Sequence, residues 1–239
     1  MKVFSFFTGG KDSTAAYLKA CEDSFHPDLL VTVIPGKSDS YMFHTINLKF
    51  TVYHAMLLNN KITYYHVSGV KEREVDELRP LISSLYEAGY TMATVGGIAS
   101  NYQRRRLERL LGEYGIELYA PFWGYNQEEV LHRYIDMGIK FMLVSVSTNG
   151  LGREALGWVI DGDDDVEMLV RLGEKYGFNP TGEGGEYESF VLYTPRFWGS
   201  IKPRRYRVYW DGVSGYLELE DISIKVRGNS LERRMDLEI

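Results

Sequence analysis

Two glycine-rich segments contain most of the residues whose types and spacing suit phosphate and acid–base chemistry. The first follows an apolar run and consists of Thr8, Gly9, Gly10, Lys11, Asp12 and Ser13. Glycines that lead into a helix make an anion site, because free N–H groups and the positive end of the helix dipole point at one spot. The glycines also permit close backbone approach and positive φ, and Lys11 adds a mobile positive charge. This spacing predicts a phosphate-binding loop.

The spacing of this loop differs from two better-known phosphate motifs. A Walker-type loop has the form G-x-x-x-x-G-K-[ST], whereas Lys11 follows two adjacent glycines. The dinucleotide fingerprint G-x-G-x-x-G has no fixed lysine. A phosphate loop of another class therefore remains. The alternative is an ordinary glycine-rich turn in which Lys11 and Asp12 are solvated.

The second segment, residues 181–188, combines three glycines with Glu183, Glu186 and Glu188. Carboxylates on a backbone that approaches a ligand closely suit Mg²⁺ binding, or acceptance of a proton from an attacking amine. Exposed Gly-Glu loops are common, so this segment indicates a functional site only if it lies beside a nucleotide site. The sequence contains no H-E-x-x-H motif and no Cys/His cluster, and transition-metal catalysis is therefore not predicted.

Composition narrows the classes of protein to which the chain can belong. Its 239 residues suffice for one large or two modest domains, and 44% hydrophobic with 25% charged residues is typical of a globular protein. A net charge of −6 argues against a globally basic nucleic-acid binder, so direct nucleic-acid contact is not expected. The single cysteine, Cys21, cannot form an intrachain disulfide, which favours a reducing compartment. Without a leader-like N-terminus or an apolar run of ~18 residues, we expect a cytoplasmic protein with no membrane contact.

Predicted strands and helices alternate through the first part of the chain. After the N-terminal run, apolar segments predict strands at residues 29–35, 62–67, 91–95, 116–120 and 141–146. Helical spacing predicts helices at 12–24, 46–60 and 71–89, and two more that begin at caps formed by Ser100 and Asn126. Strict alternation predicts an α/β fold with a doubly wound, Rossmann-like parallel sheet. Ligands of such sheets bind beyond the carboxyl ends of the strands, where we expect residues 8–13, 35–44, 96–103 and 121–125 to gather.

The pattern changes near residue 147. A helix is predicted at 163–177, and Asp163, Asp164 and Asp165 at its start indicate either a metal site or acidic residues that interact with the helix dipole. Strand-like runs follow at 189–193, 205–210 and 215–226. We therefore expect a nucleotide-binding domain over residues 1–147 and a smaller C-terminal α+β domain over 148–239 that receives the substrate.

Three further segments give the sequence a specific resemblance. Behind the Thr-Gly-Gly-Lys-Asp-Ser loop come S-Y-M-F-H at 40–44, G-I-A-S-N-Y-Q-R at 97–104 and G-E-G-G-E-Y-E-S-F at 182–190. Together they resemble the diphthine–ammonia ligase family, the N-type ATP pyrophosphatases, over about residues 1–200. Thr8 stands where ATP pyrophosphatases usually have Ser, Asn101 where many relatives have Asp, and Ser189 where relatives often have Thr. Each of these changes leaves a polar side chain in place.

The resemblance implies a reaction and a set of site residues. The family adenylates the carboxylate of diphthine, a modified histidine on translation elongation factor 2, and ammonia then displaces AMP. ATP and Mg²⁺ are the implied cofactors, with ATP held by residues 8–13. Lys11 and Asp12 are expected to act on the phosphates, and Glu186, with Glu183 as second choice, to orient ammonium. Asp12 and Glu186 are the expected Mg²⁺ ligands, and the substrate residues are expected to include His44, Ser100, Asn101, Gln103, Gly184 and Gly185.

Several alternatives stay open at this stage. His44 suits a turn histidine as well as a substrate contact, and Ser100 and Asn101 suit a helix cap alone. Cys21 is predicted to be buried, whereas sulfur-transfer relatives generally use cysteines, and glutamine-hydrolysing relatives carry a nucleophilic Cys in an extra domain that is not seen in this sequence. Free ammonia, or ammonia from a partner, is therefore the expected donor. The expected partner is elongation factor 2 bearing diphthine, and a homodimer is left open. The competing functions are adenylation of tRNA or a small carboxylic acid, and a non-catalytic adenine-nucleotide sensor.

Overall fold

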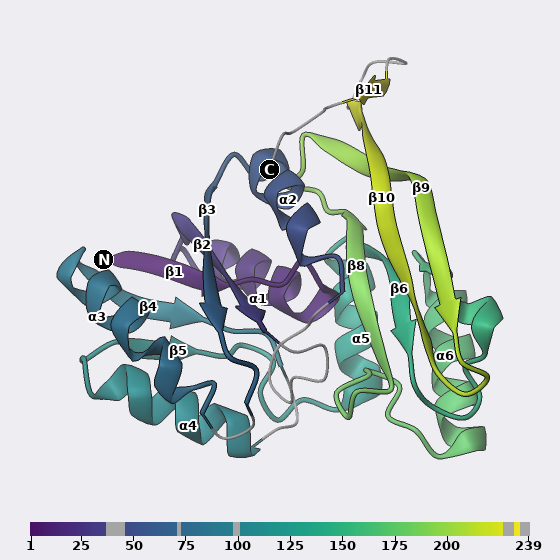
Figure 1. Ribbon diagram of the computed structural model, residues 1–239, viewed down its shortest axis with the longest axis horizontal. Coiled ribbons are helices and arrows are strands. Elements are labelled where there is room, and N and C mark those ends of the chain that lie inside the picture. The colour runs from purple at the N-terminus through teal and green to yellow at the C-terminus, as the bar shows by residue number, and fades with distance from the viewer. Residues whose placement is uncertain (37–45, 71–72, 98–100, 227–231, 235–239) are drawn as a thin grey trace. The chain divides into compact units, whose positions relative to one another are not determined.

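A parallel five-stranded sheet organises the N-terminal part of the protein (Figure 1). The computed structural model describes residues 1–36, 46–70, 73–97, 101–226 and 232–234, with the backbone alone for 101–103 and 232–234. The chain divides into two units, Met1–Gly124 and Tyr125–Ile239. In the first unit the strands are β1 (Lys2–Phe6), β2 (Leu29–Pro35), β3 (Lys61–Val67), β4 (Tyr90–Thr94) and β5 (Glu117–Tyr119). Their spatial order is β3-β2-β1-β4-β5, which confirms the predicted doubly wound architecture.

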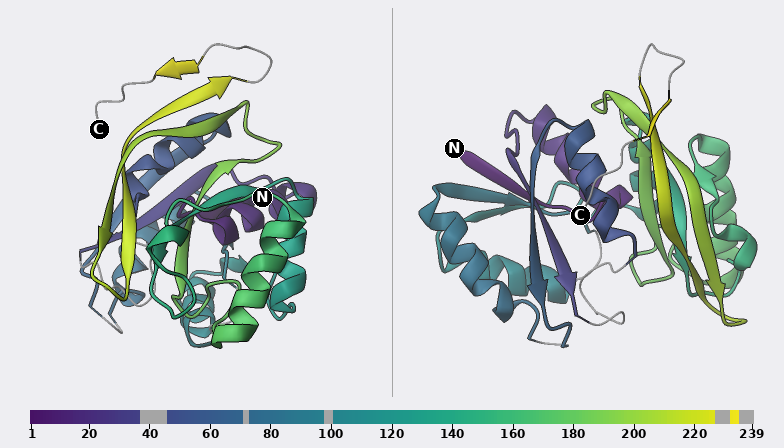
Figure 2. Two further views of the ribbon diagram at one scale, coloured as in Figure 1. Left: turned by 90° about the vertical axis from the view of Figure 1, so that its right-hand side faces the viewer. Right: turned by 45° about the horizontal axis from the view of Figure 1, so that its top comes forward.

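Helices cover both faces of this sheet (Figures 1 and 2). One face packs on α1 (Lys11–Glu22) and α2 (Thr51–Leu57), and the other on α3 (Arg79–Glu87) and α4 (Asn101–Gly112). Alternation along β1 accounts for the two cores. Phe4 and Phe6 join the cluster that includes Ile82 of α3 and Leu111 of α4. Phe7, just after β1, contacts the opposite layer through the ring of Tyr17.

Two predicted helices are shorter than expected. The range 46–60 contains a 3₁₀ turn, η1 (Leu48–Phe50), followed by α2, and the range 71–89 contains η2 (Asp76–Leu78) followed by α3. Pro80 explains where α3 begins, because proline lacks an N–H donor and fits an α-helix only in its first turn. Gly89, with a φ of +87°, lies between the end of α3 and the start of β4, which begins at the next residue.

The C-terminal unit is built on an antiparallel sheet. Its central strand β6 (Lys140–Val146) pairs with β7 (Val159–Ile160), β8 (Tyr187–Tyr193) and the start of β10 (Gly215–Val226). Along its length β10 also pairs with β9 (Gly199–Trp210) and with β11 (Glu232–Arg234). The helices of the unit are η3 (Arg153–Ala155), α5 (Gln127–Asp136) and α6 (Asp163–Tyr176), and α5 packs against α6.

The prediction that residues 141–146 form a sixth strand of the parallel sheet is wrong. The strand exists as β6, but it lies at the centre of the antiparallel sheet. A strand covered on both faces has the same continuous apolar pattern in either kind of sheet, so the pattern does not tell which sheet it joins. Because α5 and β6 belong to the C-terminal unit, the chain divides after residue 124, whereas the sequence predicted a boundary at 147.

The predicted cap at Asn126 is confirmed, whereas Asp165 at the start of α6 bonds to groups that lie outside the helix. Asn126 caps α5, and its side chain accepts hydrogen bonds from the N–H groups of Glu128 and Glu129 at 3.0 and 3.3 Å. At the start of α6, Asp165 accepts hydrogen bonds from the Trp158 indole and the Asp161 N–H, both at 3.1 Å.

Among the described residues no group of three His, Cys, Asp or Glu side chains is arranged to hold a metal ion. In this same part of the chain, no helix is both long and apolar enough to cross a membrane.

Candidate active site

The loop between β1 and α1 has the geometry of an anion site. Gly9 adopts the left-handed φ of +75°, and Gly10 is the N-cap of α1 with extended backbone. Among the described residues no side chain caps this helix N-terminus. A helix end without a side-chain cap directs its first-turn N–H groups and its dipole toward an incoming anion. The loop also lies at the carboxyl end of β1, next to β4, where the strand order of the sheet reverses.

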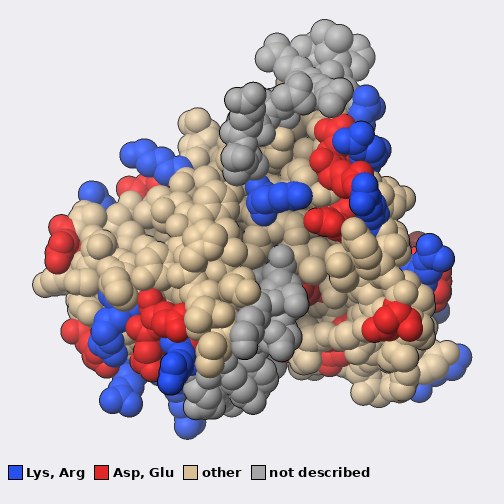
Figure 3. All heavy atoms as spheres, in the orientation of Figure 1, with Lys and Arg blue, Asp and Glu red and all other residues tan. Residues whose placement is uncertain are grey.

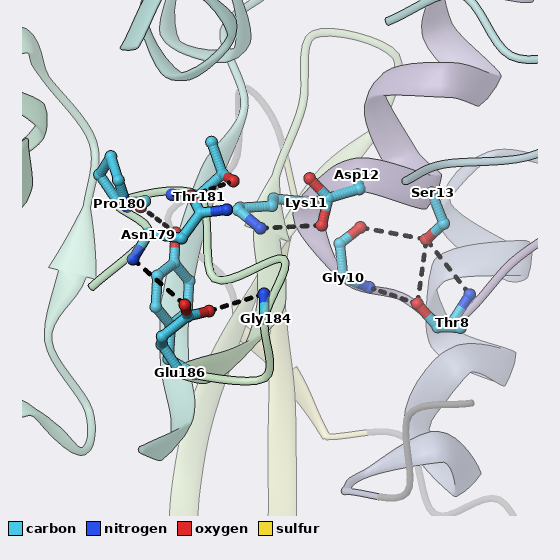
Figure 4. Close-up of polar contacts among 11 residues, drawn as sticks. Thr8, Gly10, Lys11, Asp12, Ser13, Asn179, Pro180, Thr181, Gly184 and Glu186 are labelled. Carbon is cyan, nitrogen blue, oxygen red and sulfur yellow. Dashed lines mark hydrogen bonds and ion pairs between the residues drawn. The ribbon is translucent and has the colours of Figure 1, made fainter. Parts of the chain in front are cut away.

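The two hydroxyl residues of the loop brace it internally (Figure 4). Ser13 Oγ donates to the carbonyl of Gly10 at 3.1 Å and accepts from the N–H of Thr8 at 3.2 Å. Thr8 Oγ1 lies 3.2 Å from Ser13 Oγ and accepts from the N–H of Gly10 at 3.4 Å. The loop is thus closed by its own side chains. Threonine in place of serine at position 8 keeps each of these bonds.

Lys11 and Asp12 form a partly buried ion pair in the first turn of α1. Lys11 Nζ donates to Asp12 Oδ2 at 2.8 Å, and the two side chains are only 4% and 16% exposed. Charges removed from water in this way require compensation. A phosphate group would supply an alternative anionic partner for the lysine, so the pair suits a site that exchanges one anion for another.

Neighbouring elements press closely on the loop, one in the segment 96–103 that was expected at this edge of the sheet and one, His54, that was not expected there. A Cβ placed on Gly96, which follows β4, would lie 2.3 Å from the carbonyl carbon of Asp12 and from the nitrogen of Ser13. A Cβ on Gly9 would lie 2.7 Å from Cε1 of His54, a fully buried residue of α2. Only glycine fits at either position. The Gly96-Gly97 pair after a strand was the available sequence signal for the first contact, whereas His54 gave none.

Buried hydroxyls hold the end of β1 above α2. Thr32 Oγ1 on β2 donates to the carbonyl of Phe7 at 2.7 Å. Thr51 Oγ1 donates to the carbonyl of Leu48 at 2.7 Å and lies 3.0 Å from the hydroxyl of Tyr64. Burial raises the pKa of Tyr64, while its hydrogen bond with Thr51 acts in the opposite direction. The phenol therefore stays neutral, and the network links β1, β2, β3 and α2 without a charge.

The second glycine-rich segment forms a closed loop in the C-terminal unit (Figure 4). The carboxylate of Glu186 accepts from the N–H of Asn179 at 3.1 Å and from the N–H of Gly184 at 2.7 Å. Gly182 and Gly185 adopt left-handed φ values of +74° and +87°, and the N–H of Gly185 donates to the carbonyl of Gly182 at 3.0 Å. This turn places Glu183 and Gly184 at its two central positions. Glu183 is half-buried.

The structure groups the predicted site residues into two sets. Residues 8–13 form the first loop, and Glu183, Gly184, Gly185 and Glu186 form the second, each within its own unit. His44 and Ser100 lie outside the described residues. Asn101 and Gln103 lie at the start of α4, where the backbone alone is described.

The residues present fit the two implied cofactors differently. The uncapped helix end, Gly9 and Lys11 fit the phosphates of ATP. Asp12 supplies an oxygen ligand of the kind that Mg²⁺ prefers. Glu186 fits a metal less well, because each of its carboxylate oxygens already accepts a hydrogen bond from the backbone of its own loop.

Comparisons with known proteins match both halves of the chain. Residues 1–118 match the diphthamide synthase N-terminal domain, and residues 126–225 match the diphthamide synthase C-terminal domain. The division between the two units falls in the gap between these matches.

Three similar relatives carry the same name. A diphthine–ammonia ligase of Homo sapiens is 28% identical over 219 residues, covering 82% of this chain and 80% of the relative. That of Danio rerio is 28% identical over 220 residues, covering 82% and 84%. That of Schizosaccharomyces pombe is 28% identical over 214 residues, covering 82% of this chain and 35% of the relative.

A solved structure described as a predicted tRNA methyltransferase subunit from Methanocaldococcus jannaschii covers 82% of this chain and 98% of its own, at 16% identity and a TM-score of 0.44. That likeness is too weak to support a conclusion about function.

Proposed function

Because the chain belongs to the diphthamide synthase family, we propose that it amidates diphthine on translation elongation factor 2 with ATP and ammonia. The observation that carries this proposal is the match of both domains of that family along one chain. ATP-dependent diphthamide biosynthesis agrees with the phosphate loop between β1 and α1. The N-terminal unit is accordingly proposed to bind ATP, and the C-terminal unit to receive the protein substrate.

The proposed chemistry has two steps. A carboxylate oxygen of diphthine attacks the α-phosphorus of ATP, and the bond from that phosphorus to pyrophosphate breaks. Ammonia then attacks the acyl carbon, the bond to AMP breaks, and the amine loses a proton. The products are the amide, AMP, pyrophosphate and one proton.

The residues of the first loop suit the first step. Pyrophosphate gains negative charge as it departs, and the N-terminus of α1 and the ammonium of Lys11 are arranged to stabilise it. Lys11 would exchange Asp12 for phosphate oxygens as the nucleotide binds. Mg²⁺, when bound, would neutralise part of the phosphate charge. Asp12 is the residue that we propose to hold it.

The second step requires a group that accepts a proton from the attacking amine. Carboxylates serve as such bases when they lie within hydrogen-bond reach of the proton. The carboxylate loop offers Glu183 and Glu186 for this role, and Gly184 and Gly185 give it a backbone that a substrate can approach closely. His44, Ser100, Asn101 and Gln103 remain proposed substrate contacts.

The proposed partners are elongation factor 2 bearing diphthine and ammonia, in the cytoplasm, without direct nucleic-acid contact. Charge on β9 and β10 of the C-terminal unit supports the proposed lack of nucleic-acid contact. Arg205 and Arg207 on β9 both pair with Glu220 on β10, at 3.5 and 2.5 Å. Charges of both signs lie side by side along these strands (Figure 3), whereas binding to nucleic-acid phosphates relies on a surface of unneutralised basic residues.

A reconstituted reaction tests the proposal. Purified protein is incubated with ATP, Mg²⁺, ammonium and elongation factor 2 carrying diphthine, and AMP and the mass of the modified histidine are followed. We expect AMP and amide in equal amounts, and neither product when ammonium or the elongation factor is omitted. AMP formed with tRNA or a small acid instead would point to a different adenylating enzyme. ATP binding without AMP in any mixture would point to a nucleotide sensor.

A further inference from the structure

Glu186 is bound by its own loop through both ends of its carboxylate. Its two oxygens accept hydrogen bonds from N–H groups five residues apart in the chain, those of Asn179 (3.1 Å) and Gly184 (2.7 Å). In Figure 4 the side chain points back into the loop, toward these two nitrogens. Hydrogen bonds from N–H groups to a charged acceptor are among the stronger ones in proteins. The carboxylate therefore fixes the path of the chain between residues 179 and 186.

The glycines of the loop match this position of the carboxylate. A Cβ added to Gly184 would lie 2.6 Å from Oε1 of Glu186, so any larger residue at 184 would displace the carboxylate. A Cβ on Gly182 would lie 2.9 Å from the ring and the carbonyl oxygen of Tyr187. Glycine at these positions thus makes room for Glu186 and Tyr187, besides permitting approach by a ligand.

The base of the loop is held separately. Ser147, just after β6, donates from its hydroxyl to the carbonyl of Gly185 at 2.6 Å and from its N–H to the carbonyl of Glu186 at 2.8 Å. The hydroxyl of Tyr187 donates to the carbonyl of Pro180 at 2.8 Å. These bonds anchor the ends of the loop to the sheet. The carboxylate of Glu186 adds a further tie between the turn at residues 182–185 and that base, beside the bond from the N–H of Gly182 to the carbonyl of Asn179 at 2.9 Å.

We propose that Glu186 is a positioning residue that shapes this loop, and that Glu183 is the carboxylate that accepts the proton from the attacking amine. Glu183 occupies a central position of the turn that the Gly185–Gly182 hydrogen bond closes. A base must reach the proton that it accepts, and the oxygens of Glu186 are directed to the backbone of the loop. The assignment to the amine-attack step rests on the proposed function. The shaping of the loop does not.

Hydrogen exchange tests the positioning role without any substrate. In Glu186→Gln an NH₂ group replaces one of the two accepting oxygens, so one loop N–H loses its acceptor. We expect NMR-detected exchange of the Asn179 or Gly184 amide to speed up about tenfold, as the loss of one hydrogen bond to a charged group predicts. Glu183→Gln should leave both rates unchanged. Glu174→Gln, an exposed carboxylate of α6, is the matched control.

Kinetics with the elongation factor separate the two carboxylates. Glu183→Gln should lower kcat at least a hundredfold and abolish the acidic limb of its pH profile. Glu186→Gln should keep the shape of that profile while kcat/KM for the protein substrate falls. Gly184→Ala, which displaces the same carboxylate without removing it, should reproduce the Glu186→Gln result, and it serves as the second variant if Glu186→Gln does not fold.

Two results would overturn the inference. The first is an unchanged exchange rate at both amides in Glu186→Gln. The second is loss of the acidic limb in Glu186→Gln with its retention in Glu183→Gln, which would make Glu186 the base. A wild-type protein that forms no AMP with the elongation factor would instead refute the proposed function, and the exchange data would still decide how the loop is shaped.

Discussion

Replacing Gly96 with alanine tests whether the segment after β4 sets the position of the loop that we propose to bind phosphate. The added Cβ would lie 2.3 Å from the carbonyl carbon of Asp12 and the nitrogen of Ser13, and 2.5 Å from the carbonyl oxygen of Asp12. All three atoms belong to the backbone in the first turn of α1, so no side-chain rotation can relieve the contact. Ordinary van der Waals contact begins near 3.4 Å. The two segments must therefore separate by about 1 Å.

This separation should affect stability and binding to different extents. Overpacking of this kind typically costs about 1–3 kcal/mol, which corresponds to a fall in Tm of about 2–12 °C for a protein of this size. A displacement of about 1 Å in a site that aligns reacting groups can lower the rate about a hundredfold. Since the α1 N-terminus is the proposed phosphate site, we expect the loss of AMP formation to exceed what the loss of stability explains.

Calorimetry for Tm, titration with a non-hydrolysable ATP analogue and AMP formation provide the three measurements. Gly112→Ala is the control, because a Cβ at this last residue of α4 would have no neighbour within 4 Å and alanine favours a helix. It should keep the affinity for the analogue and keep or raise Tm. If Gly96→Ala retains wild-type Tm, affinity and turnover, then the close contact between the β4 segment and α1 does not control the site.

Three further substitutions probe the supports of the fold and site. Thr32→Val leaves the buried carbonyl of Phe7 without its donor and should lower the free energy of unfolding by about 1–3 kcal/mol in urea titrations. Asn126→Ala removes the cap of α5 and should cost about 1 kcal/mol in the same assay, with unchanged affinity for the ATP analogue. Hydrogen bonds from Ser68 lower the pKa of Glu77 below its ordinary value of 4.5, so this carboxylate stabilises the fold above that pH and loses the effect as the pH falls through its folded-state pKa. Ser68→Ala should raise the pKa of Glu77 in an NMR titration and make stability less dependent on pH in the acidic range.

For each of these three predictions, a specific result would contradict it. Thr91→Val, at an exposed position of β4, is the control for Thr32→Val, and equal losses in the two variants would mean that the buried hydrogen bond contributes nothing. A change in nucleotide affinity in Asn126→Ala would contradict the assignment of that residue to the cap alone. An unmoved titration of Glu77 in Ser68→Ala would show that its pKa does not depend on the Ser68 side chain.

The sequence predicted the strands of the N-terminal sheet because each is a short apolar run between turn residues. Residues 29–35 coincide with β2, and the break at Gly9 and Gly10 coincides with the end of β1 and the start of α1. The sheet to which β6 belongs could not be predicted, because pairing depends on contacts between distant segments. The same limit applies to Glu186. Its carboxylate was identified as a catalytic candidate, whereas its backbone partners at Asn179 and Gly184 follow only from the folded loop.

The sequences of β1 and β2 contained a signal for some of the contacts between strands. Thr32 interrupts the apolar run of β2 and Ser5 that of β1, and both side chains are fully buried. A buried hydroxyl needs a hydrogen-bond partner, because leaving it unpaired costs free energy. Thr32 finds the carbonyl of Phe7, and Ser5 Oγ accepts from Thr94 Oγ1 of β4 at 2.7 Å. Both bonds connect β1 to a neighbouring strand, one on each side of it. A polar residue inside an apolar strand therefore indicates where the sheet is fixed, and here the fixed strand is the one that carries the loop proposed to bind phosphate.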